Sequence, residues 1–288
     1  MAAPNTSPPP TADQSITTPQ ATRLLTTFAD FLTVCIHNIL YYRNLYPPST
    51  FLTSRAYNLP VHQSRHPAVC AWIRDAVDAA RAQLAQGTIE RLAIVIYGPS
   101  AAAVLERWMF DVAQFPAWGG LATRGDEGDG TTESASTSDD DDDDDDDDDE
   151  DEDDDDDPEA GDEEKQQQQQ KERSNINWTN IDEQLRAAVR RLAYGGENMT
   201  PLPEGCTFTV VLELRDEAEA PIGHPQPWVA TQPSLQTVSK DQPASGGDVG
   251  GAKTTALRAV EAAPLFFECW VEEGKAKFDL LSTRSSEK

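Results

Sequence analysis

The stretch LLTTFADFLTVCIHNILYYRNLY, residues 24–46, decides the fold of this chain. Apolar side chains recur three or four residues apart along it, at positions 24, 28, 31, 32, 35, 39, 42 and 46, which is the spacing of one helix face. Apolar residues at positions 25, 36 and 40 broaden that face, so the pattern predicts a helix in the middle of a core. We expect the helix to end at Pro47-Pro48, because proline lacks the N–H that a helix needs.

Downstream of the core helix, the sequence predicts a short extended segment and a second helix. Residues 51–61 are punctuated by Asn58 and Pro60, which favours a hairpin or an edge strand. Pro67 suits the first turn of a helix, and Gly87 suits its C-terminal cap. The apolar stripe of this second helix comprises Val69, Trp72, Ile73, Ala76, Val77, Ala80 and Leu84.

Two apolar runs of strand length come next, and they predict a β-hairpin. The runs cover residues 91–97 and 104–112, and Gly98-Pro99-Ser100 supplies the turn between them. Alternate residues of a strand share a face, so the second strand should present one mainly apolar face to the core. The residues expected on that face are Val104, Trp108, Phe110 and Val112.

A third helix and a third strand are expected in the second half of the chain. Thr179 and Asp182 approximate a capping box ahead of helically spaced apolar residues, and Gly195-Gly196 are expected to end that helix. Phe208, Val210, Leu212 and Leu214 then alternate with polar residues. Such alternation is typical of a half-buried strand.

For the C-terminal region the sequence predicts a loop followed by one strand. Residues 215–255 are rich in Pro, Gly, Ser and Gln, with Trp228 as an isolated anchor, and residues 265–271 form an apolar run. Helices and strands alternate too irregularly for repeated βαβ units, whereas the hairpins favour antiparallel pairing. The sequence therefore predicts an α+β fold with helices packed on one face of an antiparallel sheet.

A long acidic insertion interrupts this pattern. Residues 121–173 hold 28 acidic and 4 basic residues, a net charge of −24 out of −28, and 139–157 is an unbroken run of 19 carboxylates. Such charge density repels itself and has nothing to bury, so we expect disorder there. The expected organisation is a tail at residues 1–20, one domain at 21–276 carrying the insertion, and a C-terminal tail at 277–288.

Motifs for catalysis, cofactors and metals do not stand out. The sequence has no GxGxxG, GxxxxGK[ST], HExxH or GxSxG, so we expect no enzyme activity and no cofactor. His62, His66 and Cys70 are four residues apart and could suggest a metal site. Pro67 argues against one continuous helix across them, so we prefer to interpret them as residues with structural roles. The four cysteines, without CxxC spacing, are expected to be reduced core residues.

Partners of two other kinds are also not expected. Outside the insertion the chain is slightly acidic and shows no basic patch, so we expect no direct binding of nucleic acid. No apolar stretch reaches the roughly 20 residues that span a bilayer, and no signal peptide is apparent, which favours the cytosol or nucleus. An acidic chaperone of basic proteins remains an alternative, because dense carboxylates imitate the phosphates of DNA.

Short strings along the chain resemble the HORMA family. They are HNILYYRNLYPPSTF at 37–51, YNLPVHQSRHP at 57–67, PEGCTFTVVLELR at 203–215, PW at 227–228 and WVEE at 270–273. The resemblance implies three main helices on an antiparallel sheet, with a C-terminal safety belt that wraps an extended peptide of a partner. It is strongest to those family members that serve as non-catalytic accessory subunits of DNA polymerase zeta.

That resemblance implies partners and binding residues. The expected ligand is a Pro-containing segment of the catalytic subunit of DNA polymerase zeta, bound by Tyr46, Tyr57, Trp72 and Trp228. The C-terminal domain of the Y-family scaffold polymerase is expected at Thr254, Glu268 and Trp270. For each aromatic residue the alternative is ordinary core packing.

The resemblance also implies possible assembly states and a cellular place. Arg186 corresponds to an arginine at a HORMA homodimer interface, and a remodelling ATPase is a further possible partner. The implied role, adaptor in translesion DNA synthesis, places the protein in the nucleus, with the cytoplasm as a second expected location. A spindle-checkpoint or meiotic HORMA adaptor is the alternative within the family, because it would share the belt and choose other peptides.

Overall fold

The structure is a computed structural model that describes residues 16–99, 103–116, 118, 176–215, 218 and 251–286. Trp228 and the acidic insertion, for which the sequence analysis made predictions, lie outside these described residues. The domain boundaries expected at residues 21 and 276 stay predictions.

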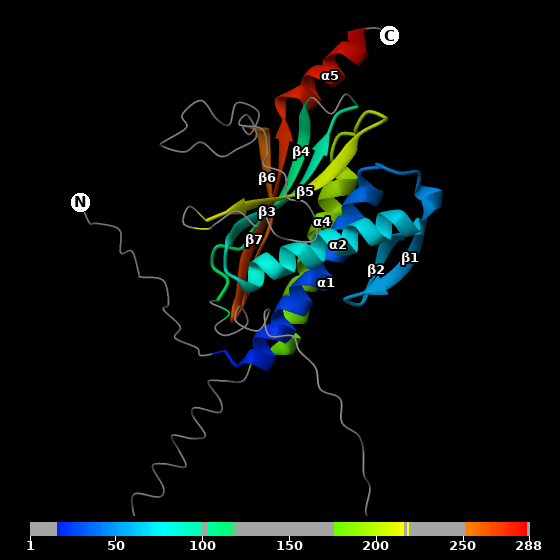
Figure 1. Cartoon of the computed structure of the whole chain (residues 1–288). Coiled ribbons are helices and arrows are strands. Elements are labelled where there is room, and N and C mark those ends of the chain that lie inside the picture. Colours follow the sequence, from blue (N-terminus) through cyan, green and yellow to red (C-terminus); the bar gives the residue numbers. More distant parts are fainter. Residues whose placement is uncertain are drawn as a thin grey trace, which may run out of the picture. The chain divides into compact units, whose positions relative to one another are not determined.

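A five-stranded antiparallel sheet forms the centre of the described fold, with strand order β5-β3-β4-β7-β6 (Figure 1). The fold class expected from the sequence is thereby confirmed. The C-terminal hairpin of β6 and β7 lies against β4, whereas β5 pairs with β3 on the opposite side. The strands are β3 Ile89–Tyr97, β4 Val104–Asp111, β5 Thr207–Leu214, β6 Gly251–Ala262 and β7 Leu265–Gly274.

Helices cover one face of this sheet and bury a single large core against it (Figure 1). Phe28 and Phe31 project from the first helix, and their rings meet Phe267 of β7 at centroid distances of 5.3 and 5.4 Å. A separate hairpin packs against the first helix through its second strand. These elements are α1 Thr18–Tyr42, η1 Pro48–Thr50, β1 Phe51–Ala56, β2 Leu59–Ser64, α2 Pro67–Ala85, α4 Trp178–Asn198 and α5 Lys275–Ser286.

Helix α1 is long and apolar enough to meet the length and composition test for a membrane span, contrary to the expectation that no stretch reaches that length. Most of the apolar stretch that meets this test is buried inside the fold, as it is in the core helix of a soluble protein. The four cysteines are free; Cys35 and Cys269 are buried in the core, as expected, whereas Cys70 and Cys206 are only half-buried.

The core helix ends earlier than predicted, at Tyr42 instead of near Tyr46. Asn44 adopts a left-handed conformation with φ 53°. The backbone N–H of Asn44 donates to Tyr41, and that of Leu45 donates to Leu40. These two hydrogen bonds form the closing motif that commonly ends helices, so Asn44 stops α1 before the prolines are reached.

Helix α4 departs from its predicted limits at both ends. Asn177 caps it, because its side chain accepts from the backbone N–H of Asn180, so the predicted capping box at Thr179 and Asp182 is wrong. The helix also continues through Gly195-Gly196 to Asn198. A Cβ on Gly196 would lie 2.9 Å from the Cβ of Tyr42, so this glycine permits close packing of α4 on α1 and does not end the helix.

Two strand predictions also need correction. Val104 does not share a face with Trp108, Phe110 and Val112, because a register shift beside Tyr97 turns it to the helix-free face. Residues 251–255 belong to β6 and not to a loop. The loop prediction failed there because β6 is an edge strand with exposed polar residues, whose strand form depends on pairing with β7.

Candidate functional site

Strand β5 is the part of the sheet best suited to receive another chain. Within the described residues it pairs on one side alone, with β3, so its outer edge carries no strand. Residues of β5 are exposed or half-buried along its whole length, whereas β4 is buried at every position but its last. A long apolar edge presents unpaired N–H and C=O groups that can pair with an extended peptide.

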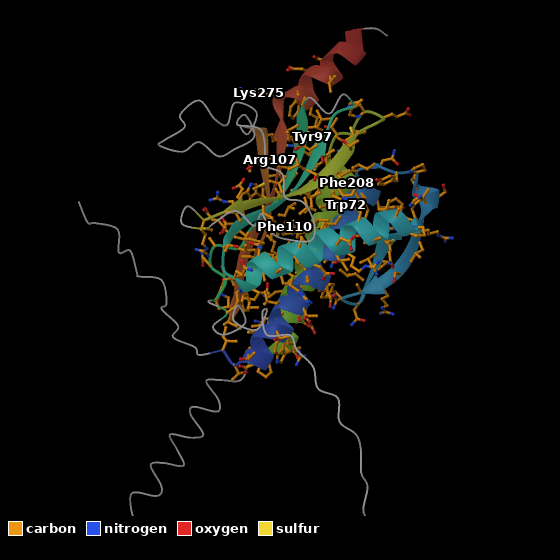
Figure 2. All side chains as sticks on the ribbon, in the orientation of Figure 1. Trp72, Tyr97, Arg107, Phe110, Phe208 and Lys275 are labelled. Atoms are coloured by element: carbon orange, nitrogen blue, oxygen red, sulfur yellow. The ribbon has the colours of Figure 1, made fainter. Side chains whose placement is uncertain are left out.

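Trp72 of α2 stands beside this edge, and Figure 2 labels it next to Phe208 of β5. The two rings meet edge to face, with centroids 5.0 Å apart and planes at 78°. Trp72 is nevertheless 41% exposed, which is unusual for the largest apolar side chain. The predicted contact residue therefore offers an open aromatic surface at the border between α2 and β5.

The position of α2 follows from buried polar contacts at its N-terminal side. Asn38 of α1 accepts a hydrogen bond from the backbone N–H of His62, and Nδ1 of His37 accepts one from that of Ser64. These bonds fix β2 on α1 immediately before Pro67 begins α2. Burial lowers the pKa of His37 to about 4, so the imidazole stays neutral and able to accept.

The two predicted tyrosines are half-buried and packed against the main core. Tyr57 lies in the β1–β2 turn with φ 51°, and its ring meets Phe31 of α1 at 6.5 Å. Burial raises the pKa of the Tyr57 hydroxyl, and Asp30 contributes further. Burial also raises the pKa of Tyr46. The contacts of Tyr57 place it in the helical layer, whereas those of Trp72 place it at β5.

The second predicted surface is brought together on the helix-free face of the sheet. Thr254 lies opposite Glu272 on β7, and Glu268 and Trp270 lie four and two residues before Glu272, so all share one face. The indole N–H of Trp270 donates to Glu272 at 2.8 Å. Thr254 and Glu268 are exposed and Trp270 is half-buried.

The remaining residues that the sequence analysis singled out are Arg186 on α4 and His62, His66 and Cys70, for which a structural role was preferred over a metal site. Arg186 is exposed on α4, on the side away from the core. The ring of His62, one of the three residues weighed as metal ligands, stacks on Tyr41 with ring centroids 3.4 Å apart. The described residues contain no group of three or more His, Cys, Asp or Glu side chains that could hold a metal ion.

The sequence did not predict a buried ionic network that joins β4 and β7, two interior strands of the sheet. Glu106 and Glu273 on neighbouring strands, Arg43 after α1 and Lys277 in α5 are all at most 3% exposed. Charged residues inside the apolar runs of β4 and β7 were the available signal. Their partners lie as far as 171 residues away, so the sequence could not pair them.

The chain between β5 and β6 joins opposite edges of the sheet. Leu214 ends β5 at one edge and Gly251 begins β6 at the other edge, so residues 215–250 run from edge to edge. Four strand intervals of about 4.8 Å separate the two edges, roughly 19 Å in all. The predicted belt residue Trp228 belongs to this connection.

Comparisons with known proteins agree with this architecture. The HORMA domain model matches residues 25–254. The DNA polymerase zeta processivity subunit of Schizosaccharomyces pombe is 38% identical over 89 residues, which cover 31% of this chain and 41% of that protein. The mitotic spindle assembly checkpoint protein MAD2B of Gallus gallus is 34% identical over 88 residues, with 31% and 41% covered. The matched part thus spans about two fifths of each relative.

Solved structures show the same fold at low sequence identity. A chain of the mitotic checkpoint complex aligns with a TM-score of 0.54 and 17% identity, covering 87% of this chain and 98% of its own length. HTP-2 of C. elegans, bound to closure motif 1 of HTP-3, aligns with a TM-score of 0.50 and 12% identity, covering 90% and 89%. Together with the family match over most of the sequence, these findings identify the chain: it belongs to the HORMA domain family.

Proposed function

We propose that this chain is a non-catalytic adaptor subunit of translesion DNA polymerase zeta in the nucleus. It binds an extended, Pro-containing segment of the polymerase catalytic subunit along the outer edge of β5. On its helix-free sheet face it binds the C-terminal domain of the Y-family scaffold polymerase, and so joins the two polymerases during tolerance of DNA damage.

The observation that carries this proposal is the apolar outer edge of β5, which pairs with no strand among the described residues and lies beside the exposed ring of Trp72. A peptide strand added at that edge would satisfy the free N–H and C=O groups of β5 through main-chain hydrogen bonds. Its side chains on the helix side would meet Trp72 and Phe208. Aromatic residues at such positions commonly dominate binding free energies.

The topology supplies the reason for slow release. Residues 215–250 leave β5 at one edge and rejoin the sheet at β6 on the other edge. A segment that passes over a bound peptide must move aside before the peptide can leave, which lengthens the lifetime of the complex. Trp228 lies in this segment and is proposed to contact the peptide.

The names of the relatives support DNA polymerase zeta as the partner, and they also support the alternative of a checkpoint role. The relative from S. pombe is a processivity subunit of DNA polymerase zeta, and similar relatives carry the name of a spindle assembly checkpoint protein. A checkpoint or meiotic adaptor would use the same β5 edge for a different peptide. The identity of the bound peptide therefore separates the two roles.

Binding of synthetic peptides to the purified chain tests this proposal. We expect a Pro-containing peptide of the polymerase zeta catalytic subunit to bind more tightly than an HTP-3 closure motif. Trp72→Ala and Trp228→Ala should each weaken that binding about thirtyfold or more, because truncating a central aromatic residue commonly costs 2 kcal/mol or more. Isothermal titration calorimetry gives the dissociation constants.

Tyr194→Ala is the matched control, because Tyr194 is 63% exposed on α4 and makes no contact with β5 in the proposal. It should leave peptide binding unchanged. Trp270→Ala should weaken binding of the scaffold polymerase domain and leave peptide binding intact. If Trp72→Ala and Trp228→Ala stay within twofold of the unmodified chain, the proposed site is wrong.

A further inference from the structure

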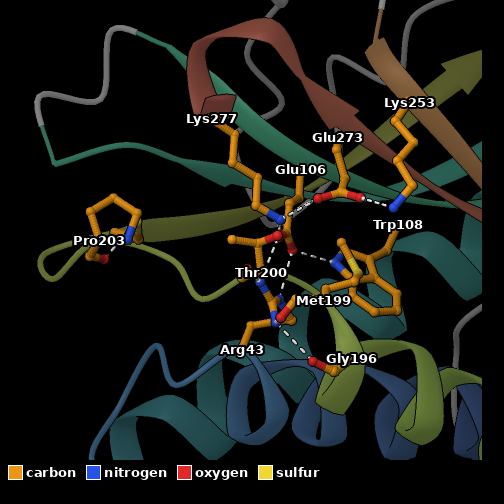
Figure 3. Close-up of polar contacts among 11 residues, drawn as sticks. Arg43, Glu106, Trp108, Gly196, Met199, Thr200, Pro203, Lys253, Glu273 and Lys277 are labelled. Atoms are coloured by element: carbon orange, nitrogen blue, oxygen red, sulfur yellow. Dashed lines mark hydrogen bonds and ion pairs between the residues drawn. The ribbon is translucent and has the colours of Figure 1, made fainter. Parts of the chain in front are cut away.

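Two carboxylates face each other inside the protein, across the junction between the C-terminal hairpin and the rest of the sheet. Glu106 of β4 lies directly opposite Glu273 of β7, and their side chains are 0% and 2% exposed. The ammonium of Lys277 in α5 lies between them and donates to both at 2.6 Å (Figure 3). A buried cation thus bridges two carboxylates that would otherwise repel each other.

Glu106 also binds two side chains that do not belong to the C-terminal hairpin. Arg43, which follows α1, donates to both oxygens of Glu106 at 3.0 and 2.7 Å, and the indole N–H of Trp108 donates at 3.2 Å. Arg43 also donates to the carbonyl of Gly196 in the last turn of α4. A cation at a helix C-terminus is favourable, because the carbonyl ends of the helix carry partial negative charge.

The network is therefore divided between two parts of the chain. Arg43 and Glu106 belong to the body of the fold, whereas Glu273 and Lys277 belong to the C-terminal hairpin and the helix that continues it. Among the described residues, two ion pairs join these two parts: Lys277 with Glu106, which is fully buried, and Arg107 of β4 with Glu272 of β7, which is partly exposed. Lys253 of β6 also pairs with Glu273, but its side chain is 60% exposed and lies within the hairpin itself.

Close backbone packing brings Lys277 to this position. Gly274 ends β7 directly before α5, and a Cβ there would collide with the carbonyl oxygen of Val104. The glycine lets the junction of β7 and α5 lie on β4, and the first turn of α5 then directs Lys277 inward. Figure 2 places Lys275 at the start of the same helix, where it is exposed.

We propose that Lys277 is a latch, which holds the β6–β7 hairpin on β4 by placing its ammonium between the carboxylates of Glu106 and Glu273. The hairpin begins with β6, which directly follows residues 215–250, the segment that connects β5 to β6. Release of the latch lets the hairpin leave β4 while β3, β4 and β5 stay folded. The consequence for peptide release rests on the proposed function; the latch itself does not.

Electrostatics explains why a single lysine can control whether the β6–β7 hairpin stays on β4. Burial by itself raises the pKa of Glu273, but hydrogen bonds and charge attraction from Lys277 and Lys253 outweigh burial and leave the pKa below its usual range. Without the ammonium of Lys277, Glu106 would keep Arg43 and Glu273 would keep the exposed Lys253, but the two buried carboxylates would face each other with no cation between them. Removing one partner of a buried ion pair is strongly destabilising for this reason.

Hydrogen–deuterium exchange of the peptide-free chain tests the latch. In Lys277→Met, backbone amides of β6 and β7 should exchange at least about tenfold faster, while those between β3 and β5 keep their rates. Lys275→Met is the matched control and should leave all strands unchanged. The double variant Glu273→Gln with Lys277→Met should show intermediate acceleration, because it removes the repulsion without restoring the latch.

Two outcomes would overturn the latch. One is equal exchange of β6 and β7 in Lys277→Met and Lys275→Met; the other is equal acceleration of every strand, which would make Lys277 a general stabiliser. Should Lys277→Met fail to fold, the charge-balanced double variant decides by the same comparison. A chain that binds no polymerase peptide refutes the proposed function alone, whereas slow peptide dissociation from a chain with fast β6–β7 exchange refutes the control of release.

Discussion

At the scale of single residues, buried polar side chains place the elements that border β5. His37 is 4% exposed, and its Nδ1 accepts a hydrogen bond from the backbone N–H of Ser64 at 3.3 Å. This bond ties β2 to α1 just before the helix that carries Trp72. Because burial lowers the pKa of His37 to about 4, protonation would both cost desolvation and remove the acceptor.

The pKa of His37 predicts how stability depends on pH. Between pH 6.5 and about 4 the unfolded chain takes up a proton that the native imidazole does not, so unfolding should become easier as pH falls. The loss is about 1.4 kcal/mol per pH unit, and above 6.5 both states are neutral at this position. Urea unfolding of the chain and of His37→Asn at pH 7, 6 and 5 measures it.

Asparagine keeps an acceptor near the position of Nδ1 but does not titrate, so His37→Asn should show a shallower fall in stability over this range. His62, whose pKa burial also lowers, titrates in both proteins and cancels in the comparison. Parallel stability curves for the two proteins would contradict the assigned role of His37.

At the scale of elements, two glycines that look like a helix end in the sequence lie where α4 packs on its neighbours, Gly196 against α1 and Gly195 against β6. A Cβ on Gly196 would meet the Cβ of Tyr42, which is fixed to the backbone of α1. A Cβ on Gly195 would meet Cδ2 of Leu257, the far end of a flexible side chain. The two neighbouring positions thus offer a comparison between a rigid and a yielding contact.

Gly196→Ala should destabilise the protein by about 1–3 kcal/mol, the usual cost of forcing extra atoms into a packed interface. Gly195→Ala should be close to neutral, since Leu257 can move and alanine favours a helix by about 1 kcal/mol over glycine. Thermal and urea unfolding of both variants measures the difference. Equal effects of the two substitutions would show that helix propensity, and not contact with Tyr42, governs this interface.

The spacing of apolar residues predicted those helices and strands that bury one regular face against the core. The helical spacing of α1 and the alternation in β5 are strong because a continuous core lies against them. The limits of α1 depended on Asn44 in a left-handed conformation, which spacing does not reveal. β6 was missed because its exposed polar residues become a strand through pairing with β7, a property of the folded chain.

At the scale of the whole fold, strand order decides which edge can receive a peptide. The C-terminal hairpin pairs with β4 and leaves the outer edge of β5 without a strand in the described part of the chain. The resemblance to HORMA proteins could name Trp72, but its contact with Phe208 and the exposure of its ring needed the fold. Long-range pairing also placed Lys277 between Glu106 and Glu273.

Hydrogen–deuterium exchange of β5 with and without the catalytic-subunit peptide tests the central claim most directly. An added strand should protect amides on the outer edge of β5, residues 207–214, because peptide carbonyls would accept from them. The same peptide should leave the outer edge of β6, at the far side of the sheet, unchanged. Binding of the peptide with no new protection in β5, or with new protection in β6 instead, would contradict the account.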